Sequence, residues 1–495
     1  MRKILTVFFL CCGVSVARGQ TTTHISLAAL RHLKMPEVTL QSVEHVQPAK
    51  PAHAAAYVDV KGTIGGHIRF DLLLPDAWNG RFVMGGGGGF VAGVQNQAWY
   101  AVNSGYATVG TDTGHQSSSG GGASWAPYNM EAQINFGFLA VHRTAVVAKF
   151  IVRAYYGKAP AYSYFLGCSS GGAQAMMESQ RYPRDFNGIV AGAPAFNRTG
   201  YAATMVRVAQ VMYPNPKDRN HPVLTRAVLE KLHRAVLEQC GGQDGLKDGI
   251  IANPPTALFD LSKVHGLTAA QRKAIETIYQ GVSAGGRQIY PGFEIGSESP
   301  NQWTLWLVGP ATWSTLKRTD SPDADFYYGV QLYKSFIFNN PHWNYATYNF
   351  ANYWKDTKLA ASYLNSTNPN LDAFKARHGK LILWQGWADP CLPPMATVDY
   401  YKQVLALDPK AMAFCRLFMI PGCAHCGGGP GASNVHWLAA ISNWVEHGHA
   451  PNRIIASRNG PNGKVLFTRP LFPYPQYAVY KGSGNPNNAA NFIAK

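Results

Sequence analysis

The sequence has few charged residues, and acidic side chains are scarcer than basic ones. Charged residues make up 14% of the 495 positions, with 27 Asp and Glu against 44 Lys and Arg. The net charge of +17 would suit nucleic acid, an anionic surface or an acidic small molecule. The basic residues are scattered, however, without a run of five or more and without the usual nucleic-acid-binding motifs. We therefore expect no nucleic-acid partner.

The sequence also lacks a long apolar run after its N-terminus. A membrane-spanning helix needs about 20 apolar residues, and no later segment provides them. The N-terminal stretch MRKILTVFFLCCGVSVARGQ places two basic residues before a short apolar run that ends in small residues, which is typical of a secretory signal. We expect residues 1–19 to be removed and the mature protein to be secreted or periplasmic, with no membrane span. Of eight cysteines six then remain, and an even number favours disulfides in an exported chain.

The remaining chain alternates β-like and helix-like runs, which indicates a layered α/β domain. Apolar strand patterns precede a helical segment, INFGFLAVHRTAVVAKFIVRAYYG, and return near the C-terminus as KLILWQGWADP and RLFMIPGCAHC. Between residues 196 and 371 the pattern changes to many Trp, Tyr, Asn and Pro with few strand signals. We predict a catalytic domain formed by residues 20–195 and 372–495, with residues 196–371 inserted as a lid domain.

A sharp turn at GCSSG is the first candidate for chemistry. The motif G-x-S-x-G lies between an expected strand and an expected helix, as the nucleophile elbow of an α/β-hydrolase requires. It makes Ser169 the candidate nucleophile, and the backbone N–H of Ser170 a candidate donor to an oxyanion. The alternative is an ordinary strand-to-helix turn in which the serines cap the helix.

Two further residues complete a possible triad. A serine needs a base, and the base needs an acid to orient it, in the chain order Ser, Asp or Glu, His. Asp389 in GWADP and His425 in GCAHC follow expected strands in that order. His115 and His436 are rival histidines, and Asp389 alone would also suit a turn before a proline.

The run MGGGGGF offers backbone N–H groups close to a strand end. It lacks the G-K-[ST] ending of a phosphate-binding loop. We therefore predict that this loop supplies the second oxyanion donor, from Gly88 or Gly89.

The motifs GCSSGG, GWADP and RLFMIPGCAHCGGGPG, with APNRII beyond the last expected helix, resemble the tannase and feruloyl esterase family. The resemblance covers essentially the whole mature chain and implies an α/β-hydrolase fold with a large inserted lid domain. It also implies a disulfide between Cys168 and Cys426. The competing interpretation makes Cys168 the nucleophile as a thiolate, and it fails if this disulfide forms.

The segment CGGQDGLKDGI resembles the calcium loop of the same family. The resemblance implies carboxylate ligands from Asp244 and Asp248 and carbonyl ligands from Leu246 and Ile250, around a structural Ca²⁺. The family pattern has another Asp where this chain has Gly241, and a partner for Cys240 is missing. Two Asp-Gly turns without a metal explain the segment equally well.

These features predict a serine esterase that hydrolyses esters of aromatic carboxylic acids through an acyl-enzyme, with no cofactor for catalysis. The resemblance implies a small aromatic ester as substrate: a feruloyl or cinnamoyl ester, a galloyl ester or a terephthalate monoester. Two alternatives remain open: an acyltransferase with the same triad, and a catalytically silent relative that binds phenols or carbohydrates.

Overall fold

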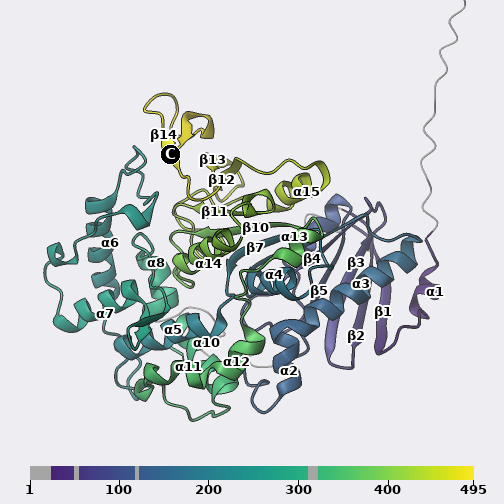
Figure 1. The fold of residues 1–495 in the computed structure, drawn as a ribbon, viewed down its shortest axis with the longest axis horizontal. Coiled ribbons are helices and arrows are strands. Elements are labelled where there is room, and N and C mark those ends of the chain that lie inside the picture. The colour runs from purple at the N-terminus through teal and green to yellow at the C-terminus, as the bar shows by residue number, and fades with distance from the viewer. Residues whose placement is uncertain (1–23, 49–54, 118–121, 310–320) are drawn as a thin grey trace, which may run out of the picture.

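A computed structural model describes residues 24–48, 55–117, 122–309 and 321–495 (Figure 1). The expected signal peptide, residues 1–19, lies outside these ranges. Within them the chain forms one large sheet flanked by helices, with most other helices gathered beside one end of that sheet (Figure 1).

The main sheet of the described residues has nine strands in the order β1-β2-β3-β5-β4-β6-β7-β10-β11. The strands are β1 (Val38–Val46), β2 (Tyr57–Ile64), β3 (Ile68–Pro75), β4 (Arg81–Gly85), β5 (Ala107–Thr111), β6 (Tyr162–Ser169), β7 (Gly188–Pro194), β10 (Lys380–Gly386) and β11 (Cys415–Ile420). From β1 to β5 neighbouring strands are antiparallel, and from β5 to β11 they are parallel. The parallel strands therefore end along one edge, where loops carrying functional groups can meet.

Successive residues of the parallel strands pack alternately into two hydrophobic cores, one on each face of the sheet. In β6, Phe165 belongs to one core, while Tyr164 and Leu166 belong to the other. Helices α3 (Ala140–Tyr156) and α4 (Ser170–Arg181) cover the first face, and α15 (Trp437–His447) covers the second (Figure 1). Burial on both faces explains why these strands read as continuous apolar runs.

The segment between β7 and β10 is mainly helical. Its helices are α5 (Arg198–Met212), α6 (Arg226–Cys240), α7 (Ala269–Gln280), α8 (Pro300–Trp303), α10 (Ala324–Leu332), α11 (Tyr353–Asp356), α12 (Lys358–Leu364) and α13 (Asp372–Ala376). One hairpin, β8 (Val282–Ala284) with β9 (Arg287–Tyr290), is its strand pair within the described residues. Residues 196–371, for which an inserted domain is predicted, fall within this segment, which lies beside the sheet in teal and green (Figure 1).

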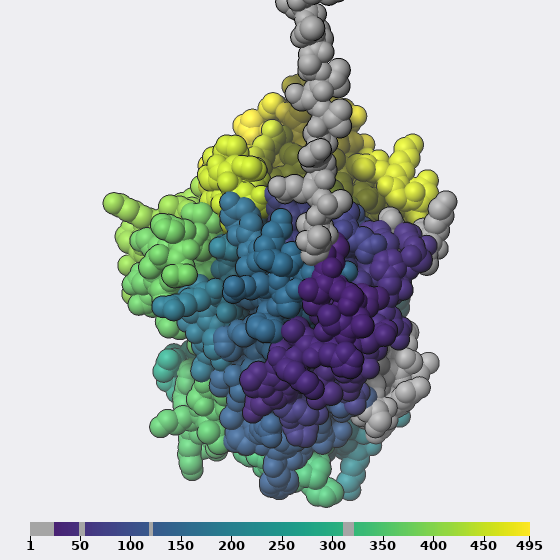
Figure 2. Space-filling view, turned by 90° about the vertical axis from the view of Figure 1, so that its right-hand side faces the viewer, coloured from purple at the N-terminus to yellow at the C-terminus, as the bar shows by residue number. Residues whose placement is uncertain are grey.

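Smaller elements complete the chain. They are α1 (Leu27–Arg31), α2 (Met130–Ile134), α14 (Pro394–Leu407), β12 (Ile454–Asn459), β13 (Val465–Leu471), β14 (Ala478–Tyr480) and β15 (Phe492–Ala494). Short 3-10 helices are η1 (Trp99–Ser104), η3 (Pro254–Thr256), η4 (Leu261–Lys263), η7 (Tyr345–Thr347), η8 (Phe350–Asn352), η9 (Ala411–Ala413) and η10 (Ala489–Asn491), and π-helical turns are η2 (Asn135–Leu139), η5 (Thr304–Val308) and η6 (Tyr333–Ile337). Figure 2 shows the N-terminal residues in purple on one face and the C-terminal residues in yellow above them.

The helical stretch Met130–Tyr156 is long and apolar enough to cross a membrane by length and composition alone. Half of its most apolar window is buried, and α3 packs against β3 and β5. Its apolar side is thus explained by the hydrophobic core, so it is weak evidence for a membrane span.

Candidate active site

The turn at GCSSG lies at the junction between β6 and α4. Ser169 ends the strand with φ 64° and ψ −123°, a left-handed conformation that is costly for a residue with a side chain. A Cβ at Gly167 would lie 2.3 Å from the carbonyl oxygen of Gly171, and a Cβ at Gly172 would lie 2.3 Å from that of Gly192. Only glycine allows the strand and helix to approach this closely. The strained elbow is therefore built from the glycines around Ser169.

The structure brings Ser169, His425 and Asp389 together. Nε2 of His425 lies 2.9 Å from Oγ of Ser169, and its Nδ1 lies 2.9 Å from Oδ2 of Asp389. The Asp389 side chain is fully buried, and that of His425 is 9% exposed. Trp306 packs edge-on against the imidazole with ring centroids 5.1 Å apart. These contacts match the arrangement of nucleophile, base and orienting acid that the sequence predicts.

Asp389 is held in place by three donors. The backbone N–H groups of Cys391 and Leu392 donate to Oδ1 at 2.8 and 3.0 Å, and Nε2 of Gln385 donates to Oδ2 at 2.7 Å. Gln385 is itself held by the Thr397 hydroxyl at 3.1 Å. The sequence analysis did not identify Gln385. Its position four residues before Asp389, near the end of a buried strand, is the signal that could have suggested it.

The glycine loop after β4 has most of its N–H groups occupied. Gly87 N–H donates to Oε1 of Gln174 at 3.1 Å, and Gly88 N–H donates to Oε1 of Gln95 at 2.7 Å. Across the described part of the chain, Gly89 N–H has no acceptor. Of the two glycines considered from the sequence, Gly89 is therefore the one whose N–H is available to a ligand.

A second glutamine supports the elbow from the glycine-loop side. Oε1 of Gln97 accepts the backbone N–H of Cys168 at 2.7 Å, and its Nε2 donates to the Cys168 carbonyl at 3.3 Å. The same Oε1 would lie 2.5 Å from a Cβ at Gly171. Gln97 was not identified from the sequence, since the contact joins a loop and a strand that are 71 residues apart in the chain.

Cys168 and Cys426 form a disulfide with a Cα–Cα distance of 5.9 Å, as the resemblance implies. The bond joins the residue before Ser169 to the residue after His425. Cys168 is thus not a free thiol, and its interpretation as the nucleophile fails. Cys391, which also borders the site, is fully buried, and this burial raises the pKa of its thiol well above the ordinary value.

Neither rival histidine contacts Ser169. His115 is buried and stacked on Trp125 with centroids 3.6 Å apart, and its Nε2 hydrogen-bonds the Phe90 carbonyl at 2.5 Å. Burial lowers the pKa of His115 to about 4. His436 is exposed at the start of α15. His115 is instead a structural residue that supports the glycine loop.

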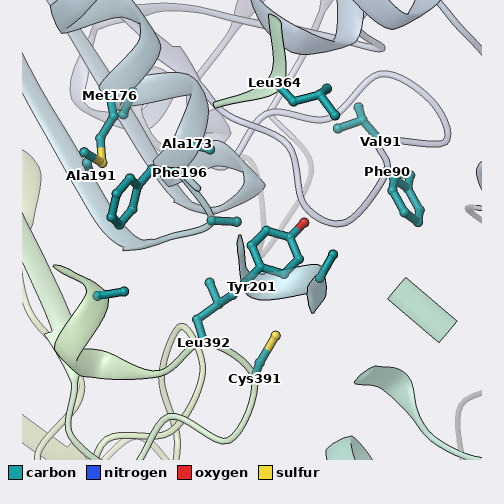
Figure 3. Close-up of a cluster of buried hydrophobic side chains, with 14 of the residues drawn as sticks. Phe90, Val91, Ala173, Met176, Ala191, Phe196, Tyr201, Leu364, Cys391 and Leu392 are labelled. Carbon is teal, nitrogen blue, oxygen red and sulfur yellow. The ribbon is translucent and has the colours of Figure 1, made fainter. Parts of the chain in front are cut away.

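A cavity of about 380 Å³ opens next to Ser169. Its walls are mostly apolar and aromatic, and they come from the glycine loop, the elbow, α5, η5, α10 and the loop after β10. The lining residues are Gly88, Gly89, Phe90, Gln97, Ser169, Ser170, Ala195, Tyr201, Met205, Trp306, Tyr328, Cys391, Leu392, His425 and Cys426. Figure 3 shows the Tyr201 ring between Cys391 and Leu392 on one side and Phe90 on the other. The β7–β10 segment thus forms part of the cavity wall.

The loop predicted to bind calcium does not fit that ion. Oδ1 of Asp244 accepts the N–H of Leu246 at 3.1 Å, and Oδ1 of Asp248 accepts the N–H of Ile250 at 3.3 Å. Oδ2 of Asp248 is paired with Nη2 of Arg469 at 3.1 Å. Calcium takes six to eight oxygen ligands, whereas the predicted set provides two carboxylates and the carbonyl groups of Leu246 and Ile250, and one of the carboxylates is already paired with a cation.

Gly241 cannot be replaced by the missing Asp without a change of the backbone. A Cβ at this position would lie 2.6 Å from the carbonyl oxygen of Leu237. Cys240, for which no partner is apparent in the sequence, is a buried free thiol. The backbone at Gly241 therefore also differs from one that could carry the Asp of the family pattern.

Within the described residues, one cluster of His, Asp and Glu side chains has its potential ligand atoms within 4.8 Å of one another, as a metal site would require: His142, Glu178 and Asp185. Nδ1 of His142 lies 2.6 Å from Oδ2 of Asp185. The ammonium of Lys149 lies 3.8 Å from the other oxygen of Asp185. Burial, followed by the charge of Asp185, raises the pKa of Glu178 well above its ordinary value. His142 and Lys149 thus contact Asp185, whereas both carboxylate oxygens of the buried Glu178 have no hydrogen-bond partner among the described residues.

The strand order, the elbow at a strand-to-helix junction and the order Ser, Asp, His along the chain define an α/β-hydrolase fold. The family model for tannase and feruloyl esterase matches residues 54–495. The chain therefore belongs to the tannase and feruloyl esterase family.

Individual relatives agree with this assignment. A probable feruloyl esterase of Arthroderma benhamiae is 32% identical over 85% of this chain and 81% of that protein. The mono(2-hydroxyethyl) terephthalate hydrolase of Piscinibacter sakaiensis is 30% identical over 92% of this chain and 88% of that protein. The crystal structure of feruloyl esterase B from Aspergillus oryzae has a TM-score of 0.82 and 25% identity, covering 95% of this chain and 100% of that chain.

Proposed function

We propose that this protein is a serine esterase that hydrolyses esters of aromatic carboxylic acids through an acyl-enzyme. The observation that carries the proposal is the continuous contact from Ser169 through His425 to Asp389 beside an aromatic cavity. A hydroxyl, an imidazole and a carboxylate in this order can activate the serine at neutral pH.

The reaction follows from the positions of these groups. His425 accepts the Ser169 proton at Nε2 as Oγ attacks the ester carbonyl, and Asp389 stabilises the imidazolium that forms. The N–H groups of Ser170 and Gly89 bind the resulting oxyanion. His425 then gives its proton to the leaving alcohol, and the same steps with water release the acid. Catalysis needs no cofactor in this scheme.

The cavity supports an aromatic acyl group. Flat side chains such as Phe90, Tyr201, Trp306 and Tyr328 present apolar surfaces that suit a planar ring. The volume of about 380 Å³ lies in the range of small-molecule sites. The relatives include a probable feruloyl esterase and a terephthalate monoester hydrolase. We propose feruloyl or cinnamoyl, galloyl and terephthalate monoesters as the substrates to test.

We further propose that the protein acts outside the cytoplasm. The N-terminal pattern of residues 1–19 is that of an export signal. The Cys168–Cys426 disulfide is a bond that persists in oxidising compartments.

The proposal is tested by hydrolysis of methyl ferulate, methyl gallate, chlorogenate and mono(2-hydroxyethyl) terephthalate. We expect turnover of at least one ester by the wild-type protein and none by Ser169→Ala. Absence of turnover on all four, with tight binding of the acids, would instead indicate a binding protein. Preferential transfer to an added alcohol over water would indicate an acyltransferase.

A further inference from the structure

Arg198 is a buried cation next to the elbow. It is the first residue of α5, and only 1% of it is exposed. Its Nη1 donates to Oγ of Ser170 at 3.1 Å, and its guanidinium lies 4.5 Å from the centre of the Phe136 ring. Ser170 follows the nucleophile and lines the cavity. Only the Ser170 side chain thus separates the guanidinium from the backbone N–H of Ser170, which would bind the oxyanion.

The charge of Arg198 is not balanced in the resting protein. Among the described residues no carboxylate pairs with it, and its Nε has no hydrogen-bond acceptor. Burial lowers the pKa of the Arg198 guanidinium, and the nearby Tyr201 opposes this shift. Burying an ion without a counter-ion is strongly unfavourable, yet arginine stays protonated. A negative charge that forms nearby during the reaction would relieve this cost.

We propose that Arg198 is a positioning residue of the oxyanion site, which holds Ser170 through its Oγ and stabilises the developing oxyanion through a buried positive charge. This inference rests on the proposed esterase function. Its physical basis is that a preorganised charge accelerates a reaction when it interacts more strongly with the transition state than with the substrate.

Variants of the two contacting side chains test the proposal. Arg198→Met should lower kcat about tenfold to a hundredfold with a nearly unchanged KM, since the lost interaction acts on the transition state. Ser170→Ala keeps the backbone N–H and loses only the anchor, so we expect a drop of about threefold to tenfold. The double variant should be no worse than Arg198→Met, because both changes act through one contact. Arg198→Lys should recover part of kcat.

Binding of a phenylboronic acid provides a readout that a purely structural role would not change. The boronate forms an anionic tetrahedral adduct with the serine and mimics the oxyanion. Its inhibition constant should rise in Arg198→Met in parallel with the loss of kcat/KM, while affinity for the neutral ester stays constant. Arg207→Met, on the same helix and bonded to Gln210, is the control and should keep wild-type kcat.

A wild-type kcat and boronate affinity in folded Arg198→Met would overturn the proposal. So would a lower melting temperature with both parameters intact. If Arg198→Met does not fold, Ser170→Ala decides, since a wild-type kcat and boronate affinity there would also refute it. If no ester is hydrolysed by the wild type, the esterase proposal fails, and boronate affinity alone still tests the role of Arg198.

A separate observation concerns the loop that does not fit calcium. Arg469 on β13 is paired with Asp248, and its side chain is 13% exposed. Its Nη1 also donates to the carbonyls of Thr468 and Pro486 at 3.0 and 2.8 Å, and its guanidinium lies 4.6 Å from the centre of the Phe492 ring. The guanidinium is therefore held firmly at the loop.

Arg469 shares a small cavity with both aspartates. Asp244, Asp248 and Arg469 line the same space of about 30 Å³. The backbone N–H of Tyr480 in β14 donates to the Asp244 carbonyl at 2.9 Å and joins the C-terminal strands to this loop. A fixed cation here repels a divalent ion and attracts the carboxylates.

The geometry points to Arg469 as an internal cation that replaces calcium in this loop. Wild-type protein dialysed against a chelator should contain no calcium by elemental analysis and keep its melting temperature. Arg469→Met should lower the melting temperature by several degrees, and the exposed Lys464→Met on the neighbouring turn should not. Stoichiometric calcium, a chelator-sensitive wild type or an Arg469→Met variant as stable as the wild type would each refute this inference.

Discussion

The loop of His425 and the loop of Asp244 and Asp248 both resemble the same family pattern, but they are held by different contacts. The loop of His425 keeps its cysteine and is joined to the elbow by the Cys168–Cys426 disulfide. The loop of Asp244 and Asp248 has lost an acidic residue and contains an unpaired Cys240, and an arginine from a distant strand contacts it instead.

The difference follows from what each loop must do. A displacement of about 1 Å between nucleophile and base can cost a hundredfold in rate, so the first loop requires one geometry. The second loop only has to join α6 to the C-terminal strands. Ion pairs and hydrogen bonds of another kind can do this equally well. The comparison thus separates a loop whose geometry the proposed chemistry requires from a loop whose contacts stabilise the fold.

The substitution with the largest expected effect on kcat is at Ser169, which the His425 loop contacts. Ser169→Ala should reduce kcat by about four to six orders of magnitude, because the three residues act as a unit. The melting temperature and the affinity for the ester should change little, as measured by thermal unfolding and by ligand binding. A variant that kept most of its activity would refute the assignment, and Asp248→Ala is the control on the other loop.

Removal of the disulfide should give the next largest effect. In Cys168→Ala/Cys426→Ala we expect kcat to fall about a hundredfold, with a loss of about 2–5 kcal/mol in unfolding free energy. Kinetics at low temperature, where the variant stays folded, separates the two effects. Cys240→Ala is the matched control. A double variant that lost stability but kept its kcat would show that the bond does not position the histidine loop.

Acid should test the glycine loop, the third side of the site, which is supported by the buried His115. Burial lowers the pKa of His115 to about 4, from an ordinary value of 6.5. As pH falls from 6.5 to 4, the unfolded chain binds a proton that the folded protein does not. The free energy of unfolding should therefore decrease as the pH falls from 6.5 to 4, by about 3 kcal/mol at most. The melting temperature of His115→Gln should depend less on pH than that of the wild type, and an equal slope would contradict this account.

The smallest effect is expected at the second loop. Asp248→Asn breaks the pair with Arg469 and should cost about 1 kcal/mol, since both side chains are partly buried. Thermal unfolding should therefore show a decrease of a few degrees, while kcat stays at the wild-type value. A large loss of kcat would mean that the two loops are coupled, and the comparison would no longer hold.

Local patterns indicated the three triad residues and several apolar strands of a layered α/β domain. A G-x-S-x-G turn and the order of Ser169, Asp389 and His425 depend on neighbouring residues and chain order, which a sequence displays directly. The pairing of Cys168 with Cys426 came from the family resemblance and is confirmed. Strand β1 was not predicted, because it is an edge strand with mostly exposed, polar residues and an irregular register.

Contacts between distant segments that no motif marks could not be predicted. Gln97 contacts Cys168 and Arg469 contacts Asp248 across 71 and 221 residues, and no local pattern indicates such partners. The same reason explains why the sequence left Gly88 and Gly89 as equal candidates. The choice depends on Gln95, whose side chain occupies one N–H group only in the folded protein.

The disulfide also determines the order in which the protein can mature. Its two cysteines are separated by 258 positions, so the loop that it closes contains the entire β7–β10 segment and Asp389. The bond can form only after Cys426, the last cysteine of the chain, has been synthesised. An oxidant must then reach both thiols. The relative placement of the elbow and the histidine loop is therefore fixed covalently only where oxidising equivalents are available, and a chain kept under reducing conditions would lack this constraint.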